Sequence, residues 1–147
     1  MSGWRDIGRR VVDFAVTFIL YYIFGVALHE MGHALVGQAL GWQASVTYPS
    51  PWAGWTSFPQ WQQMPMLDMV LIALAGGLVV CAFFLILSAF TEDWESDMVL
   101  LFFAPLHGFY SLFEVAYILH AIPQWVLATI PILPAAIIWM WMLKTRG

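Results

Sequence analysis

Apolar residues dominate four stretches of the chain, at residues 7–40, 67–90, 97–121 and 123–143. Each of the last three is close to the ~20 residues that a helix needs to cross the ~30 Å hydrocarbon core of a bilayer. The first is longer, and at about 1.5 Å per residue it must tilt, bend near Gly25 or extend beyond the bilayer. The pattern predicts an all-α, polytopic membrane helix bundle with four transmembrane segments, forming one domain over residues 1–147.

Residues 41–66 interrupt this pattern between the first two apolar stretches. The segment contains four prolines and four tryptophans, and it has no charged residue (Lys, Arg, Asp or Glu). Closely spaced prolines disfavour a helix, and tryptophans are typical of the headgroup layer of a membrane. We therefore expect an irregular loop. It either lies at the membrane interface or re-enters the protein and lines a site where its backbone is shielded from lipid.

Composition places the chain in the membrane and excludes other classes. Hydrophobic residues make up 62% of the sequence and charged residues 10%, whereas an ordinary soluble domain is about 25% charged. The formal net charge of -4, with only five Lys and Arg residues, indicates that nucleic acid is not a partner. The single cysteine, Cys81, rules out a disulfide framework and a cysteine-based zinc site.

The charged residues also predict an orientation. All basic residues lie near the chain ends: Arg5, Arg9, Arg10, Lys144 and Arg146. Four crossings put both termini on one side, and the positive-inside rule makes that side the cytoplasm. The first apolar stretch continues without a small-residue cleavage site, so we expect it to be retained rather than removed as a signal peptide. Glu92, Asp93, Glu95 and Asp97 predict a short solvated turn between the second and third segments.

The sequence His29-Glu30-Met31-Gly32-His33 carries the most specific chemistry. Two histidines four residues apart project from one helix face, which is the spacing that one zinc ion needs from a single helix. A glutamate between them is placed to deprotonate a metal-bound water. Ionisable groups are costly at membrane depth, so this cluster predicts a buried Zn²⁺ site. The alternative is that the spacing is accidental or vestigial.

A catalytic zinc site of this kind needs a third protein ligand. The candidates are Asp68, Glu114 and His120. If the first and third segments start from the same side, His29 lies about 18 residues into the first and Glu114 about 17 residues into the third, so both reach nearly the same depth. We therefore predict Glu114 as the third ligand. The alternative is a protonated or hydrogen-bonded carboxyl group that fastens helices together.

Two further features lie close to this predicted site. His107 is seven residues before Glu114 on nearly the same helix face. It is predicted to hydrogen-bond a metal ligand or to donate to the transition state, the alternative being a packed histidine bonded to a neighbouring backbone group. Gly76 and Gly77 either let two helices approach closely or leave backbone groups accessible to an extended substrate.

These residues resemble the site-2 protease family of intramembrane zinc metalloproteases. The matching residues are His29 to Leu35, then Gly41, an irregular segment, and Ala75-Gly76-Gly77 in the next apolar stretch. The resemblance covers about the first 80 residues, and it is specific only at the zinc motif. It implies that His29 and His33 bind Zn²⁺ and that Glu30 activates water. The family's third ligand is usually an aspartate in a Leu-Asp-Gly-like context, which is absent here, so Glu114 would substitute for it.

The resulting hypothesis is an intramembrane zinc metalloprotease that acts on a membrane protein or a transmembrane peptide within the lipid bilayer. The main alternative is a catalytically inactive, protease-like subunit that scaffolds a larger complex with other membrane subunits. Histidine ligation of haem is a weaker alternative, because two imidazoles on one helix face cannot bind one haem from opposite sides.

Overall fold

The structure is a computed structural model that describes residues 3–146, so residues 1, 2 and 147 of the predicted domain lie outside the described residues. Its long helices are α1 (Gly3–Ala39), α2 (Met66–Phe90) and α3 (Trp94–Ile118), followed by the shorter α4 (Gln124–Thr129) and α5 (Ile132–Arg146). Four described segments are long and apolar enough to cross a membrane: Gly8–Ala39, Met66–Phe90, Trp94–Ile118 and Gln124–Trp141. The predicted all-α bundle with four crossings is confirmed, and the chain is a multi-pass membrane protein.

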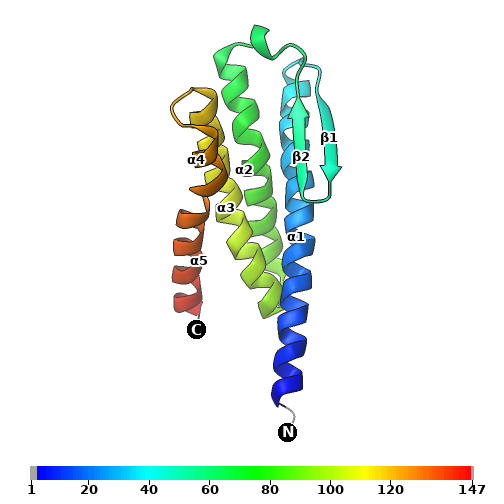
Figure 1. Ribbon diagram of the computed structural model, residues 1–147, viewed down its shortest axis with the longest axis vertical. Helices are drawn as coiled ribbons and strands as arrows, with labels where there is room; N and C mark the ends of the chain where they lie inside the picture. The colour runs from blue at the N-terminus through cyan, green and yellow to red at the C-terminus, as the bar shows by residue number, and fades with distance from the viewer. Residues whose placement is uncertain (1–2, 147) are drawn as a thin grey trace.

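The fourth crossing is broken rather than continuous as the sequence pattern predicts. Helix α4 ends at Thr129, and α5 begins at Ile132, immediately after the buried Pro131. Proline has no backbone N–H, and it disfavours helical geometry at the residue before it. Figure 1 shows α4 and α5 descending beside α3, on the opposite side of the bundle from α1.

The segment expected to be an irregular loop is instead partly regular. Strands β1 (Ser45–Ser50) and β2 (Ala53–Ser57) form an antiparallel hairpin, and a short 3₁₀ turn, η1, covers Trp61–Gln63. The prolines prevent a helix but are compatible with a two-stranded ribbon, where many N–H groups need no ladder partner. The pairing is irregular between Thr47 and Ser50, where Pro49 cannot donate a hydrogen bond. The hairpin lies alongside the upper half of α1 (Figure 1).

Aromatic and aliphatic packing between α2 and α3 fixes the relative positions of the helices. Val80 and Phe84 of α2 contact Leu100 and Phe103 of α3 in a fully buried cluster, and Phe18 of α1 packs against it. Its close-packed rings restrict α1 and α3 to one relative position. The helix turns that carry the predicted site residues lie further along these same helices.

The acidic turn between α2 and α3 is only partly solvated. Glu92 and Asp93 are exposed, as expected. Asp97, however, lies inside α3, is buried and accepts a hydrogen bond from the Ser88 hydroxyl of α2. This contact joins the two helices at the end of the bundle where their connection lies.

Candidate metal centre

His29 and His33 lie one helical turn apart on α1 and point to the same side. Both are buried, with 5% and 8% of their surface exposed. Their Nε2 atoms are 2.9 Å apart, and the two rings meet edge to face. The local geometry is the one that the spacing of the motif predicts, because residues i and i+4 share a helix face.

Glu114 reaches the same point from α3, although it is 85 residues from His29 in the chain. Its Oε1 atom is 3.3 Å from His29 Nε2 and 3.5 Å from His33 Nε2. One ligand atom from each of the three residues lies within 4.8 Å of the others. The structure therefore brings together the three residues that the sequence predicts as ligands.

The other two candidates for a third ligand are elsewhere. The Asp68 carboxylate accepts a hydrogen bond of 2.8 Å from Trp42 Nε1, which ties the end of α1 to the start of α2. His120 is an exposed residue in the turn after α3 and has a positive φ of 56°. Neither residue belongs to the group formed by the two histidines and Glu114.

The chemistry of the three side chains fits a divalent cation. Tetrahedral zinc with bonds of about 2.0–2.1 Å places its ligand atoms about 3.3 Å apart, close to the 2.9, 3.3 and 3.5 Å found here. His33 Nδ1 donates to the Ile72 carbonyl at 2.6 Å, which leaves a lone pair on its Nε2. Glu114 Oε2 is buried and has no hydrogen-bond partner among the described residues. A cation between these groups would be bound by the Nε2 lone pairs of the two histidines and by the Glu114 carboxylate.

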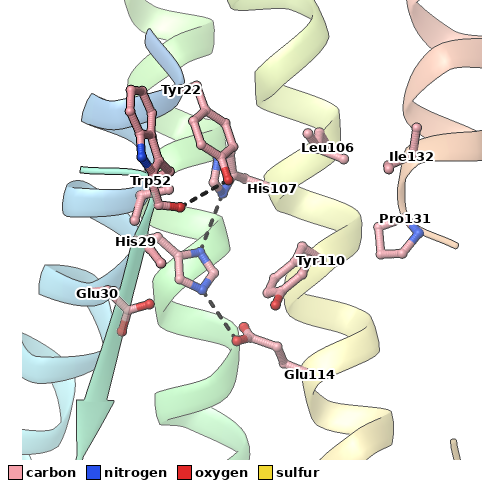
Figure 2. Close-up of a pocket in the computed structure, with 13 residues that line it drawn as sticks. Tyr22, His29, Glu30, Trp52, Leu106, His107, Tyr110, Glu114, Pro131 and Ile132 are labelled. Carbon is pink, nitrogen blue, oxygen red and sulfur yellow. Dashed lines mark hydrogen bonds and ion pairs between the residues drawn. The ribbon is translucent and has the colours of Figure 1, made fainter. Parts of the chain in front are cut away.

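His107 lies at the opposite edge of the His29 ring from Glu114, next to the other ring nitrogen (Figure 2). The Nδ1 atoms of His107 and His29 are 3.4 Å apart, so one of them must donate the proton that the other accepts. His107 also packs edge-on to the ring of Phe84. This position favours the first of the two predicted roles, in which His107 orients a ligand by hydrogen bonding.

Glycines let α2 approach the motif closely. A Cβ atom at Gly76 would overlap the His33 ring and lie 3.0 Å from His29 Nε2. A Cβ at Gly32 would lie 2.8 Å from the Ala75 carbonyl oxygen, and a Cβ at Gly77 would overlap the Ser111 hydroxyl. Of the two predicted roles for the glycine pair, the structure favours close helix approach.

The β-hairpin holds Glu30, which lies beside the three ligand-forming residues. The Thr56 hydroxyl is 2.8 Å from Glu30 Oε2 and 2.9 Å from the Glu30 carbonyl oxygen. Gly54 leaves room for the side chain, since a Cβ there would lie 2.8 Å from Glu30 Cγ. One turn earlier, the Tyr48 hydroxyl donates to the Ala27 carbonyl at 3.1 Å. Partial burial raises the pKa of Tyr48, and the negative charge of the Glu30 carboxylate raises it further by a smaller amount.

Sequence reasoning missed Thr56 and the contacts of the hairpin with α1. The available signal was the run of Val46, Thr47 and Tyr48 opposite Trp55 and Thr56, which are β-branched and aromatic residues typical of paired strands. A short connection containing Pro51 joins the two runs. Read as two short strands, these runs would have predicted a hairpin, although not the position of that hairpin against Glu30.

A cavity of about 400 Å³ opens next to the candidate ligands (Figure 2). Its lining comes from α1, the hairpin, α3 and the start of α5: Tyr22, Val26, His29, Glu30, Trp52, Ala53, Gly54, Leu106, His107, Tyr110, Glu114, Pro131 and Ile132. Its size lies within the range of small-ligand sites. It gives a substrate room to approach Glu30, His29 and Glu114.

Comparison of the chain with protein families, with curated proteins and with solved structures finds no match.

Proposed function

We propose that the protein is an intramembrane zinc metalloprotease that hydrolyses peptide bonds in or near membrane segments, similar to the site-2 protease family. The main support is the convergence of His29, His33 and Glu114 beside Glu30 inside a bundle of apolar helices. Three protein ligands with a neighbouring carboxylate are the usual arrangement of a hydrolytic zinc site. The substrates are membrane proteins or transmembrane peptides.

Each neighbouring residue has a distinct role in the proposed reaction. If His29, His33 and Glu114 hold zinc, the site would polarise the scissile carbonyl and a water molecule. Glu30 takes the proton from that water and returns it to the leaving amine. Thr56 fixes the Glu30 carboxylate, and His107 orients the His29 ring. The apolar walls of the cavity limit competing water.

We also propose that both chain termini face the cytoplasm. The bundle has four crossings, and the exposed residues Arg9, Arg10 and Lys144 lie near the two chain termini, at the same end of the bundle. Arg9 pairs with Asp13 at 3.6 Å, so this acidic residue of the first segment is already neutralised near the start of α1. The positive-inside rule then assigns the side.

The first test is the metal content of the purified protein, measured by elemental analysis. The wild type is expected to contain about one zinc per chain, whereas His33→Ala and Glu114→Gln lose most of it because each removes one of three ligands. Matched controls are His120→Asn, which suits the positive φ of that residue, and Glu92→Gln. Both controls are expected to keep the wild-type content. Equal zinc in all variants would rule out this ligand set.

The second test separates catalysis from metal binding. Glu30→Gln is expected to keep its zinc, because Glu30 is outside the ligand group, and to lose at least about 100-fold in cleavage rate. The assay uses a single-span reporter polypeptide in detergent micelles, with mass spectrometry of the products. Undiminished cleavage by Glu30→Gln would end its assignment as the base. Zinc-bound wild type that cleaves no reporter would favour the inactive subunit of a larger membrane complex.

A further inference from the structure

A second cavity, of about 260 Å³, lies on the other side of the candidate ligands from the first. Glu114 lines both cavities, whereas His29 lines only the larger and His33 only the smaller. The ligand-forming atoms of these three residues are within 4.8 Å of one another. The candidate metal centre therefore lies at the boundary between two separate spaces.

Both cavities have largely apolar walls. The larger is bounded by side chains such as Val26, Leu106 and Ile132, and the smaller by Phe58, Trp61, Ile72, Ile118 and Leu127. Apart from the site residues Glu30, Glu114 and the histidines, no described lining residue of either cavity is ionisable except for tyrosines. A charged substrate side chain would lose its hydration here, and the two carboxylates in the walls, Glu30 and Glu114, are already assigned to the proposed base and to the metal. Both cavities therefore favour uncharged apolar groups.

Strand β2 borders the two cavities in succession. Ala53 and Gly54 line the larger one, while Thr56 lines the smaller one together with Phe58, which follows the strand. At about 3.3 Å per residue, the distance from Gly54 to Thr56 corresponds to two residues of extended chain. A stretched polypeptide that passes Glu30 can thus place neighbouring side chains in both cavities. A helix rises only about 1.5 Å per residue and keeps its carbonyls in internal hydrogen bonds.

We propose that the two cavities bind the substrate side chains on opposite sides of the scissile bond. The substrate class is then a locally unwound transmembrane segment with large, uncharged apolar residues on both sides of that bond. This inference rests on the proposed hydrolytic function, which it extends to specificity. The larger cavity takes the bulkier side chain, and Lys on either side prevents productive binding.

Each cavity can be reduced separately by a substitution in its wall. Ile132→Phe reduces the larger cavity from an exposed position at the start of α5, where extra bulk does not disturb the core. Leu127→Phe fills the smaller cavity from α4. Ile137→Phe and Leu133→Phe make the same chemical changes at exposed positions that line neither cavity. The zinc content of all four variants is expected to equal that of the wild type.

The probes are single-span peptides in phosphatidylcholine nanodiscs, with Ala, Leu, Phe or Lys at two adjacent positions of the span. Cleavage by each variant is mapped by mass spectrometry. In parallel, binding of the uncleaved peptides to Glu30→Gln, with and without the cavity substitutions, is followed by fluorescence anisotropy. We expect Ile132→Phe to reduce the preference for Phe over Ala about tenfold at one position, and Leu127→Phe to do so at the other.

The two measurements distinguish failure of this inference from failure of the proposed function. If both substitutions change the preference at the same position, or neither changes it, the two-cavity inference is wrong even when zinc-dependent cleavage is present. If binding shows the opposite-position pattern but zinc-bound wild type cleaves no peptide, the inference holds for binding and the hydrolytic proposal fails. A Lys peptide that binds as tightly as the Leu peptide would overturn the assigned substrate class.

Discussion

Gly76 lies directly against the two histidines, where a single methyl group would overlap the His33 ring. The candidate site therefore depends on the absence of a side chain on α2 as well as on the imidazoles of α1. His33 is also held from the other side, because its Nδ1 donates to the Ile72 carbonyl one turn earlier on α2. The ring thus has little freedom to move away from an added atom.

We predict that Gly76→Ala displaces His33 and removes most of the bound zinc. Overpacking of a closely packed core typically costs about 1–3 kcal/mol, so the bundle is expected to fold with a lower melting temperature. Elemental analysis and thermal unfolding in detergent measure the two effects. Gly8→Ala is the matched control, since a Cβ at Gly8 meets no atom within 4 Å. A Gly76→Ala protein with full zinc content would show that His33 can bind metal in another position.

Thr56 has a similar influence on the proposed base. Its hydroxyl is 2.8 Å from Glu30 Oε2, so it acts through Glu30 and is a positioning residue. We predict that Thr56→Val keeps the zinc content and KM but lowers kcat about tenfold, because a charge-assisted hydrogen bond to the carboxylate is lost.

Two variants separate this positioning role from a general effect on the hairpin. Thr56→Ser retains the hydroxyl and is expected to restore most of kcat. Thr47→Val makes the same change on strand β1, at an exposed position, and is expected to leave kcat unchanged. Equal losses in Thr56→Val, Thr56→Ser and Thr47→Val would mean that packing, rather than the hydrogen bond, sets the rate.

Among the elements, α3 has the best-defined start. It begins at Trp94, three residues before the predicted boundary, because the Asp93 carboxylate accepts a hydrogen bond from the Ser96 backbone N–H at 2.8 Å. Side chains of this type at the N-cap satisfy one of the free N–H groups of the first turn. Hydrogen bonding to the Ser96 hydroxyl, and to a smaller extent to the Ser96 backbone N–H, lowers the pKa of Asp93 below its ordinary value.

This lowered pKa predicts a pH dependence with a defined sign. The contribution of Asp93 to stability is fully present above its ordinary pKa of about 3.9, and it is lost as pH falls through the lowered pKa. The melting temperature of the wild type should therefore fall more steeply on acidification than that of Asp93→Asn, whose amide caps the helix at every pH. Glu92→Gln is the control and should follow the wild type. Parallel curves for all three proteins would contradict the role of the Asp93 charge.

Over the whole molecule, the connections between the helices lie at the two ends of the bundle. Helix α1 begins and α5 ends toward the end of the bundle where α2 turns into α3, while the hairpin and the turn after α3 lie toward the other (Figure 1). The acidic turn is therefore on the same side of the membrane as both termini. The proposed orientation makes that side the cytoplasm.

We predict opposite accessibility for single cysteines introduced at the two ends of α3. In a Cys81→Ser background, Glu92→Cys should react with a membrane-impermeant maleimide only after permeabilisation of the cells, whereas Leu119→Cys should react in intact cells. Reversed labelling would invert the orientation but keep the number of crossings. Labelling of both cysteines from one side would contradict a membrane-spanning α3.

Features that depend on neighbouring residues along the chain could be predicted without the structure. The apolar stretches defined the four crossings, because a bilayer demands about 20 apolar residues in succession. The spacing of His29 and His33 placed both on one helix face. Even the depth of Glu114 followed from local information, since a constant rise per residue puts it level with His29 once both helices cross the same bilayer.

Contacts between distant segments, by contrast, became visible only in the three-dimensional arrangement of the helices and the hairpin. The hydrogen bond from Thr56 to Glu30 and the close contact of His33 with Gly76 each join residues far apart in the chain. No local pattern encodes which face of a hairpin meets which turn of a helix, because that choice minimises the free energy of the whole packed bundle. The two cavities arise in the same way, from the space that the assembled elements leave unfilled.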